Sequence, residues 1–173
     1  MIDTPALAEE APITPIDPVG DALQAAAVLR RFRVVFNAIR THFQQVEKQV
    51  GLGGAQVWAL SLIQAQPGIG VSELASRMDI HQSTTSNLLR ALMQKQLVRQ
   101  AKSDTDRRSV HLYIEPAGQT LLAQAPGPFE GVLPGALAQL PPATLARLDQ
   151  DLAALIALLK ADESAGQVPL AQL

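Results

Sequence analysis

The spacing of apolar residues changes in the middle of the chain from helical to alternating, and this change restricts the fold more than any other feature. Apolar positions predict two short helices over residues 71–78 and 82–94, separated only by Asp79-Ile80-His81. Residues 98–102 and 109–114 follow as two predicted strands, because apolar and polar residues alternate along the second of them. Two helices with so short a connection form a helix-turn-helix, and the strands add a β-ribbon directly after it.

The segments on either side are predicted to be helical. Asp21 starts a helix whose apolar face continues to residue 50, and another helix is expected over 54–66. Pro116 opens a further helix, an apolar stretch covers 129–140, and the last helix starts at Pro141-Pro142. The predicted fold class is therefore mainly α with a small β-wing, a winged helix-turn-helix at about 52–115 with helices on both sides.

Length and composition limit the class of protein. The 173 residues suit one domain of roughly 100–200 residues, which we expect over 21–160, between a flexible acidic arm at 1–20 and a flexible tail at 161–173. There is no cysteine, and the three histidines lack metal-ligand spacing. Without a phosphate loop or a nucleophile motif, we expect neither an enzyme nor a cofactor. No apolar run reaches the roughly 18 residues of a membrane helix, and no signal peptide is recognisable, so we expect a cytoplasmic protein.

Positive charge gathers around the predicted helix-turn-helix. Although the net charge is −2, residues 77–108 carry seven bases against three acids, which indicates either a polyanion-binding face or a solvated helix surface. Side chains that can hydrogen-bond base edges and phosphates follow one another at the start of the second short helix, and Arg90 continues the same side. The polar run comprises Gln82, Ser83, Thr84, Thr85, Ser86 and Asn87. These residues have low helix propensity, so the alternative is a helix start without a further role.

Four motifs occur in a fixed order along the chain. They are Leu52 to Leu60 with Gln56, Ser72-Glu73-Leu74-Ala75, Ser83-Thr84-Thr85-Ser86, and DTDRRSVHLYIEPAG over residues 104–118. The last is the most specific, because its D-R-R tip leads into a strand and then a helix start. In this order the motifs resemble the MarR family of winged helix-turn-helix transcriptional regulators, over about residues 22–160.

The resemblance implies roles for the turn of the β-ribbon. Asp106 would orient Arg108, which would enter the minor groove, while Arg107 would lie toward the DNA backbone. Lys102, just before the turn, completes the DNA-binding candidates. Ordinary turn chemistry is the alternative for Asp106, because aspartate is common in turns.

The sequence departs from the family pattern at four positions. Gln96 stands where glycine is common, and Glu115 stands where a threonine usually caps the next helix. Gly53 and Gly70 stand where serine or threonine is common. These departures concern helix capping and local rigidity, not the fold.

The resemblance also implies a homodimer, built from dimerisation helices at about 21–50 and 116–160, that reads a palindromic operator in double-stranded DNA. Exposed apolar stripes on the first and last helices would agree with this, and a bundle within one chain is the alternative. Members of the family bind small aromatic or anionic effectors beside these helices. The candidate ligand-binding residues are Phe32, Phe36, His42, Trp58 and Tyr113, for each of which a place in the core is the alternative.

The expected function is a homodimeric, sequence-specific DNA-binding transcriptional regulator, a repressor that a small ligand releases. One alternative is an architectural or constitutive DNA-binding protein without a ligand. Another is a winged helix that binds a protein partner, which would leave the basic ribbon unexplained.

Overall fold

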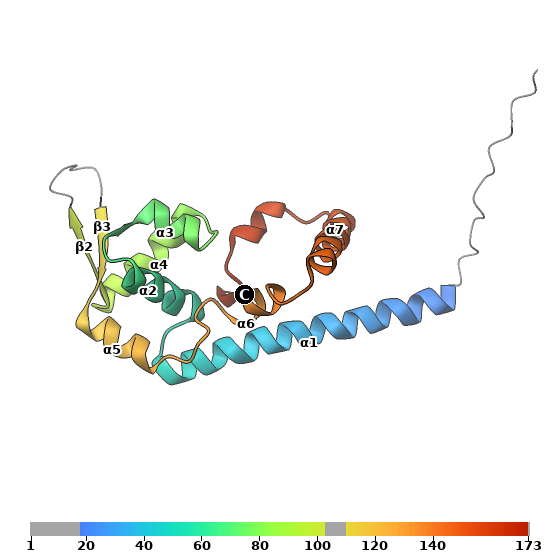
Figure 1. Ribbon diagram of the computed structural model, residues 1–173, viewed down its shortest axis with the longest axis horizontal. Helices are drawn as coiled ribbons and strands as arrows, with labels where there is room; N and C mark the ends of the chain where they lie inside the picture. The colour runs from blue at the N-terminus through green and yellow to red at the C-terminus, as the bar shows by residue number, and fades with distance from the viewer. Residues whose placement is uncertain (1–17, 103–109, 173) are drawn as a thin grey trace, which may run out of the picture. The chain divides into compact units, whose positions relative to one another are not determined.

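The computed structural model describes residues 18–102 and 110–172, and the predicted class is confirmed: the chain is mostly helical with a small sheet (Figure 1). Its elements are α1 (Pro18–Val50), α2 (Gly54–Ala65), β1 (Ile69–Gly70), α3 (Val71–Arg77), α4 (Gln82–Gln94), β2 (Val98–Lys102), β3 (Val110–Ile114), α5 (Pro116–Gln124), α6 (Val132–Leu137), α7 (Pro142–Leu159) and the 3-10 helices η1 (Glu163–Gln167) and η2 (Leu170–Gln172). Among the helices so described, none is both long and apolar enough to cross a membrane.

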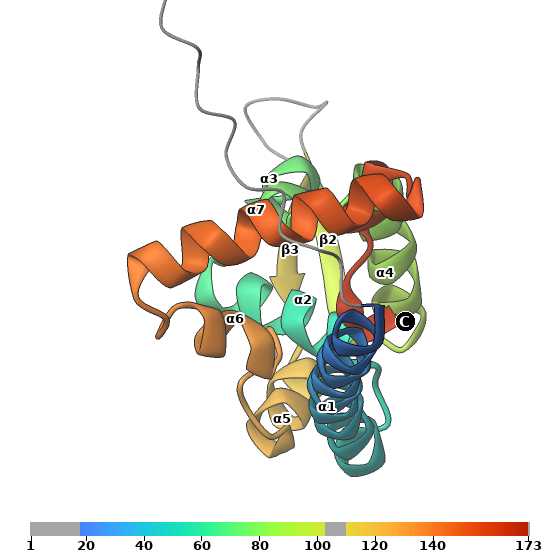
Figure 2. The same cartoon turned by 90° about the vertical axis from the view of Figure 1, so that its right-hand side faces the viewer.

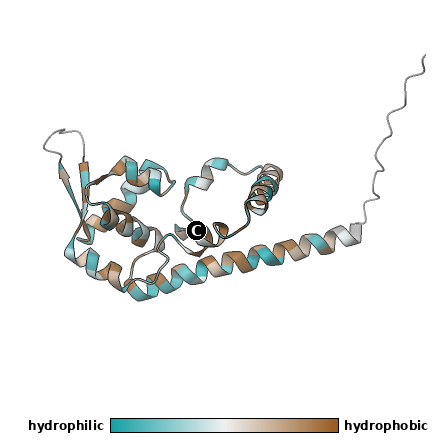
Figure 3. Ribbon diagram, viewed as in Figure 1, coloured by the Kyte–Doolittle hydropathy of each residue, from teal (hydrophilic) through white to brown (hydrophobic). Residues whose placement is uncertain are grey.

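The chain divides into two compact units, residues 1–35 and 36–173. The described part of the first unit is the N-terminal half of α1. Of its side chains that the structure describes, none is buried, and apolar and polar residues recur around the helix (Figure 3). The exposed large apolar residues of this half are Leu23, Val28, Leu29, Val34 and Val35.

The second unit contains the winged helix-turn-helix and its core (Figure 2). Three antiparallel strands form a sheet in the order β1-β3-β2. The β2–β3 pairing runs from Val98 opposite Ile114 to Lys102 opposite Val110. Helical and alternating apolar positions converge behind this sheet because each element must bury one face. The fully buried residues of this core include Leu60, Ile63, Ile69, Leu74, Leu89, Leu92 and Leu112.

Most predicted elements are found where they were expected, with differences at three places. α1 begins at Pro18 and not at Asp21, because proline is well suited to the first helical position. β1 was not predicted, since a two-residue strand is too short for a visible alternation. Only Val132–Leu137 of the apolar stretch 129–140 is helical.

The C-terminal segment also differs from the expected flexible tail. After α7 it forms η1 and η2, and η2 contacts the start of α2. Pro169 is buried, and Ala171 packs against the core. The space that Ala171 occupies is available because Gly54 has no side chain there: a Cβ on Gly54 would lie 3.0 Å from that of Ala171.

The departures from the family pattern have visible consequences. Gly53, Gly70 and Glu115 are the N-caps of α2, α3 and α5, and none makes a side-chain capping hydrogen bond. Glu115 instead pairs with Arg99, with 3.3 Å between carboxylate and guanidinium. Gln96 has a φ of 57°, a left-handed conformation that glycine adopts without strain. A strained residue that is not glycine therefore stands shortly before β2.

Candidate nucleic-acid interface

Helix α4 is amphipathic, and its two faces have different tasks. Leu88, Leu89 and Leu92 are buried and fix the helix against α2 and α3. On the other side, Gln82, Ser83 and the pair Asn87 and Arg90 are exposed. The apolar anchors therefore hold a polar surface that is free to meet a ligand.

Hydrogen bonds determine which polar atoms this surface presents. The Arg90 guanidinium donates to Asn87 Oδ1 at 3.0 Å, so the pair offers mainly N–H donors outward. Gln82 Nε2 donates to Ser72 Oγ at 3.3 Å, which links the start of α4 to the start of α3. The side-chain oxygen of Gln82 remains available as an acceptor.

Three members of the predicted polar run face differently. Thr85 is fully buried and its hydroxyl donates to the carbonyl of His81 at 3.2 Å, so the prediction that it contacts DNA is wrong. Ser86 is half-buried and donates to the carbonyl of Gln82 at 2.8 Å, and Thr84 is half-buried as well. Because the helix repeats every 3.6 residues, six consecutive polar residues cannot all share one face.

The β-ribbon adds a second part of the surface. Lys102 is exposed at the end of β2, whereas Asp106, Arg107 and Arg108 lie outside the described residues. Sequence reasoning did not single out Arg99, whose guanidinium carbon stacks 4.5 Å from the Tyr113 ring centroid. Arg99 and Tyr113 are partners across the β-ribbon. A basic residue opposite an aromatic one on paired strands was the signal that could have found Arg99.

The five candidate ligand residues do not come together. His42 is buried, where its Nε2 lies 2.9 Å from the carbonyl oxygen of Pro128, and Tyr113 lies in the ribbon under Arg99. Phe32 belongs to the other compact unit. Trp58 lines a cavity of about 300 Å³, and Phe36 lines a second one of about 400 Å³.

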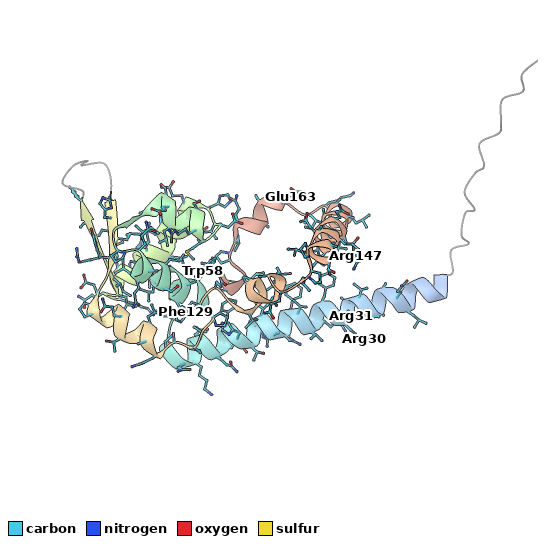
Figure 4. All side chains as sticks on the ribbon, in the orientation of Figure 1. Arg30, Arg31, Trp58, Phe129, Arg147 and Glu163 are labelled. Carbon is cyan, nitrogen blue, oxygen red and sulfur yellow. The ribbon has the colours of Figure 1, made fainter. Side chains whose placement is uncertain are left out.

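Sequence reasoning missed most of the first cavity's walls. Phe43 and Phe129 line it together with Trp58, and Figure 4 labels Trp58 on α2 and Phe129 in the segment before α6. The turn between α3 and α4 and the C-terminal segment close other sides. The walls of this cavity come from distant parts of the chain, so no local sequence pattern predicts it.

Comparison with known proteins supports the fold. A model of the MarR family matches residues 54–110. The DNA complex of S. aureus MepR is 20% identical, covers 74% of this chain and 95% of that chain, and gives a TM-score of 0.53. A MepR-like protein complexed with pseudoligands is 18% identical, with 80% and 94% covered and a TM-score of 0.51. Streptococcus pneumoniae FabT in complex with DNA is 15% identical, with 79% and 97% covered and a TM-score of 0.50. Among curated proteins, none matches the sequence.

The helix-turn-helix, the antiparallel ribbon and the polar face of α4 define the fold of a winged-helix transcription regulator. Within that class the fold is that of the MarR family, whose model matches α2 through the start of β3, so the resemblance of the sequence motifs is confirmed. None of the comparisons indicates an enzymatic family.

Proposed function

We propose that the protein is a homodimeric regulator that binds specific double-stranded DNA through α4. The observation that carries the proposal is the outward face of α4, on which Gln82, Ser83, Asn87 and Arg90 are exposed above a fully buried opposite face. A helix of this kind fits the major groove, where its N-terminal residues meet base edges. The DNA complexes among the structural neighbours support the same use of the fold.

The Asn87–Arg90 pair favours a particular kind of base edge. With Asn87 Oδ1 engaged by Arg90, the pair presents donors, and the strongest acceptors in the major groove are N7 and O6 of guanine. We expect Arg90→Ala to weaken specific binding by about 1–3 kcal/mol and to relax discrimination at one base pair of each half-site. Fluorescence anisotropy on the DNA upstream of the protein's own gene, and on single-base variants of that DNA, measures both effects. Gln45→Ala, at an exposed position of α1, is the control.

The wing supplies sequence-independent affinity in this proposal. Lys102 is exposed at the end of β2, and we expect Arg108, in the turn beyond it, to enter the minor groove with Asp106 orienting it and Arg107 toward the backbone. Arg108→Ala should weaken binding to all sequences and lower the salt slope by about one unit. Lys48→Ala, at an exposed position of α1, is the matched loss of charge. An unchanged slope and affinity for Arg108→Ala would remove the wing from the proposal.

Dimer formation is the second part of the proposal. The first half of α1 exposes Leu23 and Val34, and α7 exposes Leu158 and Leu159, so both helices offer apolar surface to another copy. A two-fold dimer would present two α4 helices to half-sites about one helical turn apart, that is, to a palindromic operator.

We also propose that the protein represses transcription and that a small ligand releases it from its DNA. The protein would meet this DNA in the cytoplasm. The test is anisotropy of the full chain on its own upstream DNA, with scrambled competitor, at several salt concentrations. Saturable binding that resists the competitor supports a regulator. Binding that ignores sequence points instead to an architectural protein, and no binding at low salt points to a protein-interaction module.

A further inference from the structure

The cavity beside Trp58 has an unusual combination of walls. Its volume is about 300 Å³, and aromatic rings reach it from three elements: Phe43 on α1, Trp58 on α2 and Phe129 before α6. Val168 and Leu170 of the C-terminal segment close another side. A pocket of this size and apolarity suits a compact organic molecule.

The charged groups of this cavity all have one sign. Asp79 and Glu130 line it, and among the residues that the structure describes no lysine, arginine or histidine does so. Both residues are exposed at the rim of the cavity that they line. An anion in the cavity would lie near two residues of like charge, whereas a cation would lie near two residues of opposite charge and three aromatic residues, whose rings can attract cations.

We propose that this cavity binds a compact apolar cation, such as an aromatic amine. Phe43, Trp58 and Phe129 provide the apolar and cation–π surface, and Asp79 and Glu130 provide the charge. This ligand class is opposite in charge to the anions that the family resemblance implies.

A neighbouring cavity shows that the assignment is specific to this site. The second cavity, of about 400 Å³, shares Phe43, Leu170 and Ala171 with the first but is lined by Arg40 and Glu47. The C-terminal segment thus contributes to both cavities. An anionic molecule would find its only basic partner, within the described lining of the two cavities, at Arg40.

The cavity also touches the part of the fold that positions α4. Met78, Asp79 and Ile80 form the turn between α3 and α4, and all three line it. Met78 and Ile80 belong to the core, and the Ile80 N–H donates to the carbonyl of Ala75 at 3.1 Å. A molecule in the cavity therefore contacts the turn that sets the angle of α4. This step, and only this step, rests on the proposed function, because it couples the ligand to DNA binding.

The binding test needs no DNA, because Trp58 is the only tryptophan of the chain. The full-length protein is titrated with phenylpropylamine, phenylpropanol and phenylpropanoate, which differ in charge but hardly in shape, under excitation selective for tryptophan. We expect saturable changes in Trp58 emission, tightest for the amine and weakest for the carboxylate. Equal affinities, a preference for the carboxylate, or no saturable change would overturn the proposal.

Charge variants test the two carboxylates. Asp79→Asn and Glu130→Gln should each weaken the amine by about two- to fivefold and leave the alcohol unchanged. Asparagine tolerates the left-handed conformation of residue 79, whose φ is 51°, so this variant keeps the turn. Glu47→Gln, a carboxylate of the second cavity only, is the matched control. If Glu47→Gln weakens the amine as much as the other two, or if Arg40→Gln abolishes all binding, the site is the second cavity and the proposal is wrong.

Anisotropy on DNA then separates the two proposals. If the amine binds at Trp58 and DNA binding fails in every condition, the proposed function is wrong and the ligand site stands. If the protein binds DNA but no member of the series perturbs Trp58, the ligand site is wrong and the regulator stands.

Discussion

The winged helix-turn-helix buries its apolar residues, whereas α7 and the first half of α1 leave theirs exposed or only partly buried. In the former, Leu89 is 1% exposed and Leu60 is fully buried, so the apolar residues have found their partners within the chain. In α7, all of which the structure describes, no residue is buried, and Leu158 is 82% exposed. The first region gains free energy of folding from its own apolar contacts, whereas α7 and the first half of α1 leave apolar surface exposed, which in our proposal another copy covers.

The largest expected effect tests this difference with the same substitution in both regions. Leu89→Ala should lower the free energy of unfolding by about 2–5 kcal/mol, because it leaves a cavity in the core. Leu158→Ala should change it by less than about 0.5 kcal/mol in dilute protein. Urea unfolding followed by circular dichroism measures both. A cost for Leu158→Ala that grows with protein concentration would identify this leucine as part of a contact between copies.

A charge on α1 should separate the copies without unfolding either. Val34→Glu places a carboxylate on the exposed apolar face of the first unit, and we expect sedimentation to report monomers. Loss of one half-site contact should weaken DNA binding at least about tenfold, since a dimer gains its second contact at high effective concentration. Gln45→Glu adds the same charge at an exposed polar position of α1. Equal behaviour of the two variants would exclude this face from the dimer.

A smaller effect is expected at the strained residue before β2. Gln96→Gly should raise the free energy of unfolding by about 1 kcal/mol, because glycine adopts a φ of 57° without the clash of a Cβ atom. Gln64→Gly, at an exposed position near the end of α2, should instead lower it by about 0.5–1 kcal/mol. Thermal unfolding of the two variants measures both changes. A Gln96→Gly variant that is no more stable than the original protein would show that residue 96 is not strained.

The smallest effect concerns the start of η1. The Ser164 hydroxyl and backbone N–H donate to the Asp162 carboxylate and hold its pKa below the ordinary value. This stabilisation is therefore present above the ordinary pKa and is lost as the pH falls through the lowered pKa. We expect the protection of the Ser164 amide, measured as its exchange rate relative to an unstructured peptide at the same pH, to fall in acid, with no change in global stability. Asp162→Asn should remove this dependence on pH.

The sequence predicted the elements with strong local signals. The bounds of α4 and β2 and the start of α5 agree with expectation, since helical spacing, alternation and Pro116 are all local features. Thr85 was misjudged because polarity does not reveal which side of a helix a residue occupies. The C-terminal segment was misjudged because small residues such as Ala171 give no local sign that they will pack against Gly54.

The ring of Phe43 links the residues that positions 43, 54 and 131 can accept during evolution. It fills the space in which a Cβ on Gly54 would lie, and a Cβ on Gly131 would come within 2.8 Å of its Cζ atom. Gly131 in addition has a φ of 100°. A side chain at position 54 would require the ring at position 43 to move or to be replaced by a smaller residue. Such changes should therefore arise as compensatory pairs, with a smaller residue at position 43.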